Sequence, residues 1–216
     1  MKKLIVLLGI LLTSTAAYAG VEGITILSQE HHVSGYAAGT GDTTSYDQTE
    51  AYLVSESVFA LWPGPNPGTN ETSSSAGNFS VTAVDRSRWT FTDSWALAES
   101  TYIFSPLADH LQFQYAGSVE MHAFENKVSA RLYDTTDNLL VDYRQWTTEL
   151  SAGLAFNETE DYTFDLSHQY ELQLYAKVFA GDNPGVTSSL EVSIVPEPCS
   201  LVLLGLGVLV LRSRRA

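Results

Sequence analysis

Two turn-like segments of the chain gather the oxygen ligands that a calcium ion prefers. The first holds Asp134, Asp137 and Asn138, and the second holds Asp182 beside Asn183. Calcium takes about six to eight oxygens from carboxylates and carbonyls, although this spacing differs from that of a helix-flanked calcium loop. Turns are also rich in Asp and Asn for purely conformational reasons. These segments are therefore the calcium candidates, with ordinary turns as the alternative.

The adjacent pair His31 and His32 is the other metal candidate. Neighbouring side chains on a strand point to opposite faces of the sheet, so these two cannot readily share one ion. His110 and His168 stand alone in the sequence. We therefore expect ordinary surface or half-buried histidines, and we predict no cofactor other than the candidate calcium.

The segment Glu120–Glu125 comes nearest to a catalytic pair. It loosely resembles the Glu-x-Asp-x-x-Glu strand of laminarinase-like glycoside hydrolases, which are jelly rolls. That resemblance implies a nucleophile and an acid/base with carboxyl groups about 5–5.5 Å apart. Here His122 replaces the Asp, and Glu125 joins the face of Glu120 only if a bulge intervenes. Motifs for serine hydrolases, zinc proteases and phosphate loops are absent from the sequence, and we predict that the protein is not an enzyme.

Aromatic residues are the remaining candidates for a binding site. The chain holds 4 Trp, 11 Tyr and 9 Phe residues. Exposed Trp and Tyr rings can stack on sugars, but the same residues also fill the cores of sandwiches. Trp89 alternates with Phe91 and is expected to pack inside, whereas Trp62 borders a Pro/Gly-rich stretch and is the better candidate for an exposed platform.

The residues between Gly20 and Ile194 alternate between apolar and polar with a period of two. In residues 111–123 the odd positions are apolar and the even positions are largely polar, as a half-buried antiparallel strand requires. The phase shifts near residues 125–126, after which the even positions turn inward. Residues 127–145 then predict a hairpin. Alternation returns at residues 162–166, 170–180 and 190–194.

Four further strands are predicted nearer the N-terminus, at residues 24–38, 49–60, 79–92 and 95–104. The Pro-, Gly- and Ser-rich stretch from residue 62 to residue 78 predicts a long exposed loop. Many short strands, few helix signals and no further shift in composition favour an all-β fold. We predict an antiparallel, jelly-roll-like β-sandwich over residues 20–193.

Residues 1–19 have the features of a secretory signal peptide. Two lysines precede an apolar run at residues 4–12, as such a leader requires. Ala17 and Ala19 place small residues at the −3 and −1 positions, which predicts cleavage before Gly20.

Residues 194–216 carry the most specific pattern in the chain. They contain, in order, Val195, Pro196, Glu197, Pro198, Cys199, Ser200, the apolar run Leu201–Leu211, and a basic end with Arg212, Arg214 and Arg215. The prolines oppose a continuing helix or sheet and would expose an extended segment to a processing enzyme. The apolar run predicts a single hydrophobic helix, and the arginines would stop transfer on the cytoplasmic side. The run is shorter than the roughly 20 residues of a typical span, so we expect a transient anchor.

This tail resembles the PEP-CTERM sorting signal of Gram-negative bacteria, in which a Val-Pro-Glu-Pro box precedes a Leu/Gly-rich segment and a basic end. The resemblance implies processing by an exosortase in the inner membrane and a setting of exopolysaccharide and biofilm production. Cys199 stands where Ser, Thr or Ala is common. The same tail is also labelled an ice-binding protein C-terminal domain. The body lacks a regular Thr-rich repeat, so we do not infer ice binding from that label.

The charge of the body restricts its partners. Between Gly20 and Ile194 there are 24 Asp and Glu residues but only six Lys and Arg residues. Such a surface repels nucleic acid and other anionic polymers, so no nucleic-acid partner is predicted. The acidic residues would attract divalent cations or simply keep a secreted protein soluble.

These patterns together predict an exported, non-catalytic surface or matrix protein linked to exopolysaccharide. We expect its tail to anchor it in the inner membrane before processing and the product to reach the cell surface or extracellular matrix. A carbohydrate-binding module-like protein is the first alternative, because aromatic residues are abundant. A jelly-roll glycoside hydrolase that uses Glu120 and Glu125 is the second.

Overall fold

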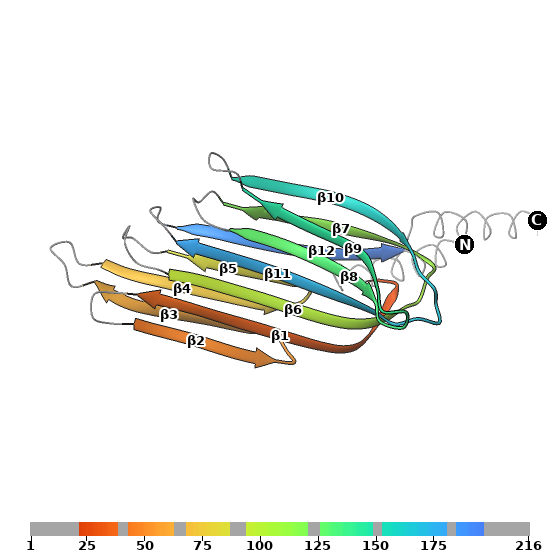
Figure 1. The fold of residues 1–216 in the computed structure, drawn as a ribbon, viewed down its shortest axis with the longest axis horizontal. Helices are drawn as coiled ribbons and strands as arrows, with labels where there is room; N and C mark the ends of the chain where they lie inside the picture. Colours follow the sequence, from red (N-terminus) through yellow and green to blue (C-terminus); the bar gives the residue numbers. More distant parts are fainter. Residues whose placement is uncertain are drawn as a thin grey trace, which may run out of the picture.

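The regular structure consists of β-strands (Figure 1). The computed structural model describes residues 22–38, 43–62, 68–86, 94–120, 126–148, 153–180 and 185–196. In these ranges the strands are β1 (Ile24–Ala38), β2 (Thr43–Glu50), β3 (Val54–Trp62), β4 (Gly68–Gly77), β5 (Ser80–Asp85), β6 (Ser94–Pro106), β7 (His110–Val119), β8 (Lys127–Asp134), β9 (Leu139–Thr147), β10 (Leu154–Thr163), β11 (Tyr170–Ala180) and β12 (Val186–Pro196). The expected all-β fold is confirmed for this part of the chain.

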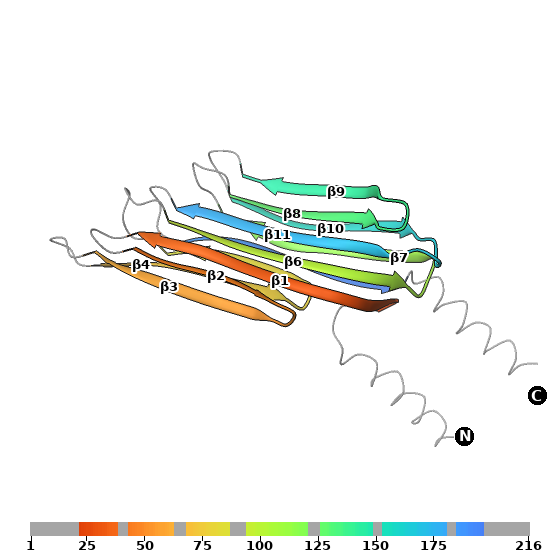
Figure 2. The same cartoon turned by 60° about the horizontal axis from the view of Figure 1, so that its bottom comes forward.

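The strands form two six-stranded antiparallel sheets that pack face to face (Figures 1 and 2). The first, called the β6 sheet here, has the order β2-β1-β6-β11-β8-β9. The second, called the β7 sheet, has the order β10-β7-β12-β5-β4-β3. Each sheet therefore has one face against the other sheet and one face outside, which is the architecture of a β-sandwich.

The core lies between the sheets and follows from the alternation of side chains along each strand. Buried positions alternate with partly exposed ones through all of β6. In β7, Leu111, Phe113 and Tyr115 point inward, as the sequence predicted. Phe113 and Phe164 are stacked with their ring centroids 5.9 Å apart. The ring centroid of Phe113 in the β7 sheet also lies 6.4 Å from that of Phe104 in the β6 sheet, so rings from both sheets meet in the core.

A tight turn joins β4 to β5 and depends on contacts with the core. Asn78 and Phe79 both have positive φ values, 51° and 56°, as the two central residues of a type I′ hairpin turn do. This conformation is unusual for a bulky residue. The ring of Phe79 stacks on Tyr102 at 4.0 Å, and its backbone N–H donates to the Tyr102 hydroxyl at 2.7 Å. The turn is therefore held by β6 of the opposite sheet.

Two sequence predictions near the N-terminus were wrong. The expected loop over residues 62–78 is largely strand, because residues 68–77 form β4. Its alternate side chains Thr72, Ser74 and Ala76 are buried. Because these side chains are small and two of them are polar, the sequence of this strand has no strong apolar alternation. The predicted strand 49–60 is in fact the end of β2, a crossing at residues 51–53 and most of β3.

The strands in the second half largely match the predictions. The hairpin expected at residues 127–145 is β8 paired with β9, and a register shift between Leu132 and Tyr133 interrupts it. In β9 the apolar Leu139, Val141 and Tyr143 are exposed, so the apolar pattern of this strand marks its outer face. The strand at 154–163, β10, begins well before the alternation that the sequence analysis detected at residue 162.

The last strand, β12, continues to Pro196, which pairs with Leu111. The expected boundary at residue 194 therefore falls inside a strand, and Ile194 is fully buried. The signal-peptide residues Ala17, Ala19 and Gly20 lie outside the described ranges. The same holds for the rest of the tail: Glu197, Pro198, the expected hydrophobic helix, and Arg212, Arg214 and Arg215. Within the described ranges, no helix has the length and apolarity that crossing a bilayer requires.

Candidate functional site

The outer face of the β6 sheet carries a groove of about 410 Å³. It crosses five neighbouring strands of this sheet, in the order β1-β6-β11-β8-β9. Its lining comprises Glu30, His32, Glu99, Thr101, Lys127, Ser129, Arg131, Tyr143, Gln173, Leu174 and Tyr175. Neighbouring strands lie about 4.8 Å apart, so four spacings give the groove a length of about 19 Å across the sheet.

A second hollow of about 270 Å³ adjoins the groove, because Tyr175 lines both. Its other lining residues are Trp95, Leu97, Lys177 and Phe179. Strand pairing explains why they meet: Phe179 lies opposite Trp95 and Lys177 lies opposite Leu97. The rings of Trp95, Tyr175 and Phe179 are half-buried. The two hollows together are called the aromatic groove here; they share Tyr175 and lie on the same face of the β6 sheet.

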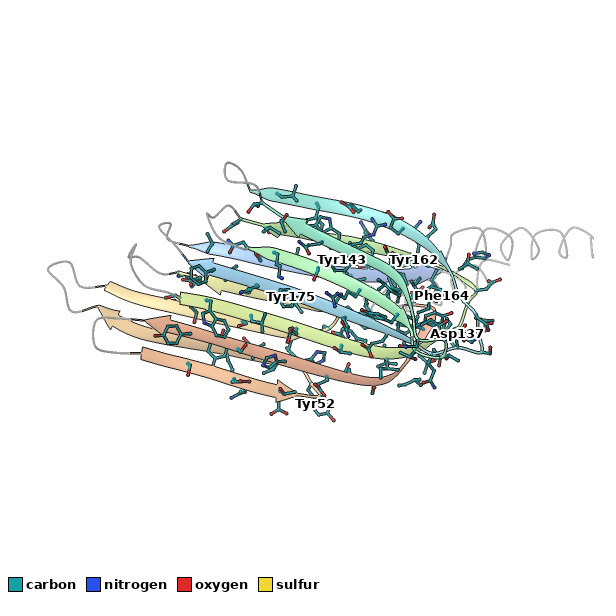
Figure 3. The ribbon with its side chains drawn as sticks, viewed as in Figure 1. Tyr52, Asp137, Tyr143, Tyr162, Phe164 and Tyr175 are labelled. Atoms are coloured by element: carbon teal, nitrogen blue, oxygen red, sulfur yellow. The ribbon has the colours of Figure 1, made fainter. Side chains whose placement is uncertain are left out.

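Strand alternation places these side chains outside. In β6 the residues between Trp95 and Thr101 at odd numbers face outward, while Ala96, Ala98 and Ser100 are buried. In β11 the even-numbered Leu172 to Val178 are buried, so Tyr175 and Phe179 share the outer face. Figure 3 shows Tyr175 on β11 and Tyr143 on β9.

Two cations lie over tyrosine rings in the groove. The Nζ atom of Lys127 lies 5.0 Å from the centre of the Tyr175 ring. The Cζ atom of Arg131 lies 5.0 Å from the centre of the Tyr143 ring. A cation over an aromatic face is held by the quadrupole of the ring. The contact fixes each side chain in place and leaves the N–H groups able to donate to another molecule.

The opposite end of the groove is acidic and contains His32. Its Nδ1 atom lies 2.9 Å from Glu99 Oε2, and its Nε2 atom lies 3.0 Å from Asp47 Oδ1. Burial alone would lower the pKa of His32, but the hydrogen bonds and charges of the two carboxylates together raise it above its ordinary value. Its neighbour His31 faces the core, where burial lowers its pKa and its Nδ1 contacts Ser100 Oγ at 3.0 Å. The expectation that the two histidines cannot share an ion is consistent with this arrangement.

The first calcium candidate forms a turn braced by a histidine. Asp134, Asp137 and His168 lie close enough to hold one ion. However, Asp134 Oδ1 accepts backbone N–H groups of Thr136 and Asp137, and its Oδ2 contacts His168 Nδ1 at 2.7 Å. Asn138 has a positive φ of 54°, so its place in the turn is conformational. Asp134 thus already serves the turn through these hydrogen bonds, and calcium binding there stays a prediction. Asp182 lies outside the described ranges.

Other candidates are only partly described. Glu120 Oε2 accepts the backbone N–H of Thr187 at 2.8 Å, so this carboxylate links the end of β7 to the start of β12. Its expected partner Glu125 and the intervening His122 are outside the described ranges, as is Trp89. Trp62 ends β3, but its side chain is not among those described.

A polar cluster closes one edge of the sandwich, between β9 of one sheet and β10 of the other. Arg144 forms ion pairs with Asp142, Glu158 and Glu160 at 2.8, 3.2 and 2.8 Å. The indole N–H of Trp146 donates to Glu158 at 3.0 Å. Burial alone would raise the pKa of Asp142, but its hydrogen bonds with a tyrosine hydroxyl and Arg144 hold it below its usual range. The cluster satisfies its own groups and joins the two sheets.

The comparisons with known proteins find only distant likeness. No protein-family model matches the chain, and no curated protein matches it. Among solved structures, it is similar to the enzymatically active domain of bacteriophage CBA120 tailspike protein 4, with 10% identity, 67% of this chain covered and a TM-score of 0.31. The chain spans 20% of that domain's length.

Two carbohydrate-binding modules are also similar to the chain. One belongs to the β-sandwich superfamily, with 9% identity, a TM-score of 0.24, and 81% of this chain and 86% of that chain covered. The other is the family 11 module of a cellulosomal cellulase of Clostridium thermocellum, with 9% identity, a TM-score of 0.23, and 67% and 85% covered. At such TM-scores, function must be argued from the groove itself.

The sequence analysis missed the residues that form the aromatic groove. It proposed Trp62 as the exposed ring, whereas the rings that line the aromatic groove are Trp95, Tyr143, Tyr175 and Phe179. A usable signal was present in residues 170–180. The positions that alternate with the apolar core set there include Tyr175 and Phe179, and aromatic residues on the solvent side of a strand indicate a binding face.

Proposed function

We propose that the chain is an exported, non-catalytic protein that binds a polysaccharide along the aromatic groove. The observation that carries this proposal is the pair of adjoining hollows that share Tyr175 and are lined by Trp95 and Phe179. A sugar ring presents an apolar face of C–H groups, which packs on a flat aromatic ring. Its hydroxyl groups lie around the edge and need hydrogen-bonding partners.

The polar residues of the groove supply those partners. Thr101, Gln173 and Ser129 line the groove on three neighbouring strands, and each side chain can donate or accept a hydrogen bond. A length of about 19 Å accommodates several sugar units. Because the groove is open along the sheet, it suits the interior of a chain and does not require a chain end.

The strand order supports the jelly-roll-like winding expected from the sequence. Strands β5 to β12 give four neighbours in each sheet, β5-β12-β7-β10 and β6-β11-β8-β9. This is the order of two interlocked Greek keys. In this winding the outer face of the β6 sheet stays uncovered by other described elements, and the aromatic groove lies on that face.

The expected routing agrees with a ligand outside the cell. The tail resembles a PEP-CTERM signal, and β12 leads directly to Glu197, the acidic residue of its box. We propose that an exosortase-type enzyme processes this tail and that the β-sandwich is released to the surface or matrix. Mass spectrometry of cell fractions tests this part: a mature C-terminus near Pro198 is expected, and a full-length chain retained in membranes would contradict it.

Affinity electrophoresis of the full chain in gels that contain soluble polysaccharides tests the binding itself. We expect retardation by at least one polysaccharide and no new reducing ends after long incubation. Trp95→Ala and Tyr175→Ala should each weaken binding about tenfold or more, because aromatic anchors dominate such interfaces.

The matched controls separate stacking from folding. Tyr175→Phe keeps the ring and should keep most of the binding. Gln114→Ala changes the outer face of the β7 sheet, where Gln114 contacts Asn157 at 2.8 Å, and should leave binding unchanged. If Trp95→Ala and Tyr175→Ala fold normally and bind like the unaltered chain, the aromatic groove is not the binding site.

A further inference from the structure

We propose that the aromatic groove selects an acidic polysaccharide, with Lys127, Arg131 and Lys177 contacting its anionic groups. This inference rests on the proposed binding function and adds the chemical class of the ligand. The shared chemistry is a repeated anion on a sugar chain, either a uronate carboxylate or a sulfate ester.

The distribution of positive charge carries the inference. The sequence between Gly20 and Ile194 has only six Lys and Arg residues against 24 Asp and Glu residues. Three of those six, Lys127, Arg131 and Lys177, line the aromatic groove. Half of the positive charge of a strongly acidic body is thus gathered on two neighbouring strands, β8 and β11.

Two of these cations are placed directly opposite each other on neighbouring strands. Lys127 and Lys177 are direct partners in the pairing of β8 with β11. Like charges directly opposite each other on a sheet are destabilising. An anion between them would remove that repulsion, so this pair suits an anionic ligand.

The groove cations also differ from the arginines that serve the fold. Arg86 pairs with Glu71, and Arg144 pairs with three carboxylates. In the described part of the chain, the side chains of Lys127 and Arg131 have no carboxylate within ion-pair distance and lie over tyrosine rings instead. Arg131 therefore keeps its guanidinium fork available for the two oxygens of a carboxylate or sulfate.

The two acidic residues of the groove lie on β1 and β6, on the other side of β11 from β8. Glu30 is on β1, three strands away from β8, which corresponds to about 14 Å. Glu99 is nearer, opposite Tyr175 on β6, but its carboxylate is paired with His32 at 2.9 Å. Surface charges separated by more than about 8 Å are largely screened at physiological ionic strength. The basic end can therefore attract an anion although the body as a whole is acidic.

Matched polymers test the charge of the ligand. The full chain is titrated with polygalacturonate and with its methyl ester, and separately with dextran sulfate and with dextran. Each pair shares a backbone and differs only in charge. We expect binding about tenfold tighter to the charged member of at least one pair, which corresponds to one charge-assisted hydrogen bond, and weaker binding as salt rises. Preference within the first pair identifies a uronate ligand, and preference within the second identifies a sulfated one.

Single substitutions assign the effect to the groove. Arg131→Gln and Lys127→Gln should remove most of the preference for the charged polymer while keeping binding to its neutral partner. Arg86→Gln removes the same charge outside the groove and should leave the preference unchanged. Equal binding to both members of both pairs, or equal effects of Arg86→Gln and Arg131→Gln, would overturn the inference. The proposed binding function fails separately, if Tyr175→Ala leaves binding to every polymer intact.

Discussion

The two outer faces of the sandwich are both surfaces of antiparallel sheets, but they carry different kinds of side chain. On the β7 sheet, neighbouring side chains bond to each other: Gln112 to Asp161 at 3.0 Å, and Gln114 to Asn157 at 2.8 Å. On the β6 sheet, Trp95, Tyr175 and Phe179 line open hollows. The β7 sheet also carries a hollow of about 340 Å³, but mostly small residues without rings line it, whereas rings and cations line the hollows of the β6 sheet.

The contrast shows how a binding face can be recognised. Its charged and aromatic side chains lie outside the core and outside the ion pairs that join the two sheets. Arg144 and Arg131 show this within one sheet. Arg144 lies at the edge cluster with three carboxylates, while Arg131 lies over Tyr143 in the groove. The predictions below separate changes that damage the common scaffold from changes that affect one face only.

The largest effect should come from the core that both faces share. Phe113→Ala removes a fully buried ring that contacts Phe104, Tyr115, Tyr162 and Phe164. We expect a loss of about 3–5 kcal/mol in the free energy of unfolding, measured by urea denaturation. Polysaccharide binding should be lost only where the protein unfolds. A variant that stays folded yet does not bind would show that the groove depends on the packing beneath it.

A smaller loss of stability is expected from a substitution that affects the β7 sheet alone. A Cβ atom at Gly117 would lie 2.1 Å from the backbone oxygen of Ser189 on β12, a distance that requires the strands to move apart. Gly117→Ala should therefore cost about 1–3 kcal/mol of stability without changing polysaccharide affinity. Gly185→Ala is a comparison with no neighbouring atom within 4 Å but a φ of +81°, so it isolates backbone strain from crowding. Weaker binding by folded Gly117→Ala would contradict the independence of the two faces.

The two arginines should separate stability from binding. Arg144→Met leaves three carboxylates close together and should lower the free energy of unfolding by about 1–2 kcal/mol, since the pairs are only partly buried. Arg131→Met should change it by less than about 0.5 kcal/mol while weakening the preference for charged polymers. Thermal unfolding monitored by circular dichroism, beside the polymer titrations, measures both. Equal destabilisation by the two substitutions would mean that Arg131 also supports the fold.

The smallest effect concerns pH and His32. Because Glu99 and Asp47 raise the pKa of His32, its protonated form stabilises the folded state. This contribution is present below the ordinary pKa of about 6.5 and is lost as pH rises through the higher pKa of the folded protein. The stability difference between the unaltered chain and His32→Gln should thus be larger at pH 5.5 than at pH 8.5, by less than about 1 kcal/mol. A difference that does not change with pH would show that the ion pairs add nothing.

Strands with strong alternation could be predicted from the sequence, and those built from small polar residues could not. The bounds of β1 match the prediction, and the inward residues of β7, β8 and β11 follow the apolar period. β4 was predicted as a loop, because Thr72 and Ser74 are buried without being apolar. Ser74 is accommodated by a hydrogen bond with the Tyr46 hydroxyl, a contact between residues 28 positions apart that local patterns do not contain.

The candidate site depends on pairing that the sequence does not display. Trp95 and Phe179 meet because β6 and β11 are neighbours with a particular register, and only the fold brings those distant segments together. The calcium candidates show the opposite case. Asp134 and Asp137 are close in sequence and in space, but the local spacing could not reveal that His168, 34 residues away, would contact Asp134.

The register shift between Leu132 and Tyr133 has a consequence for how this protein can change over evolutionary time. Side chains on a strand alternate, so a slip of β9 by one residue against β8 would exchange Tyr143 with Arg144 between exterior and interior. A slip of two residues would preserve both roles. Descendants of this chain that still bind their ligand should therefore keep the bulge in this hairpin, even where the length of the turn itself varies.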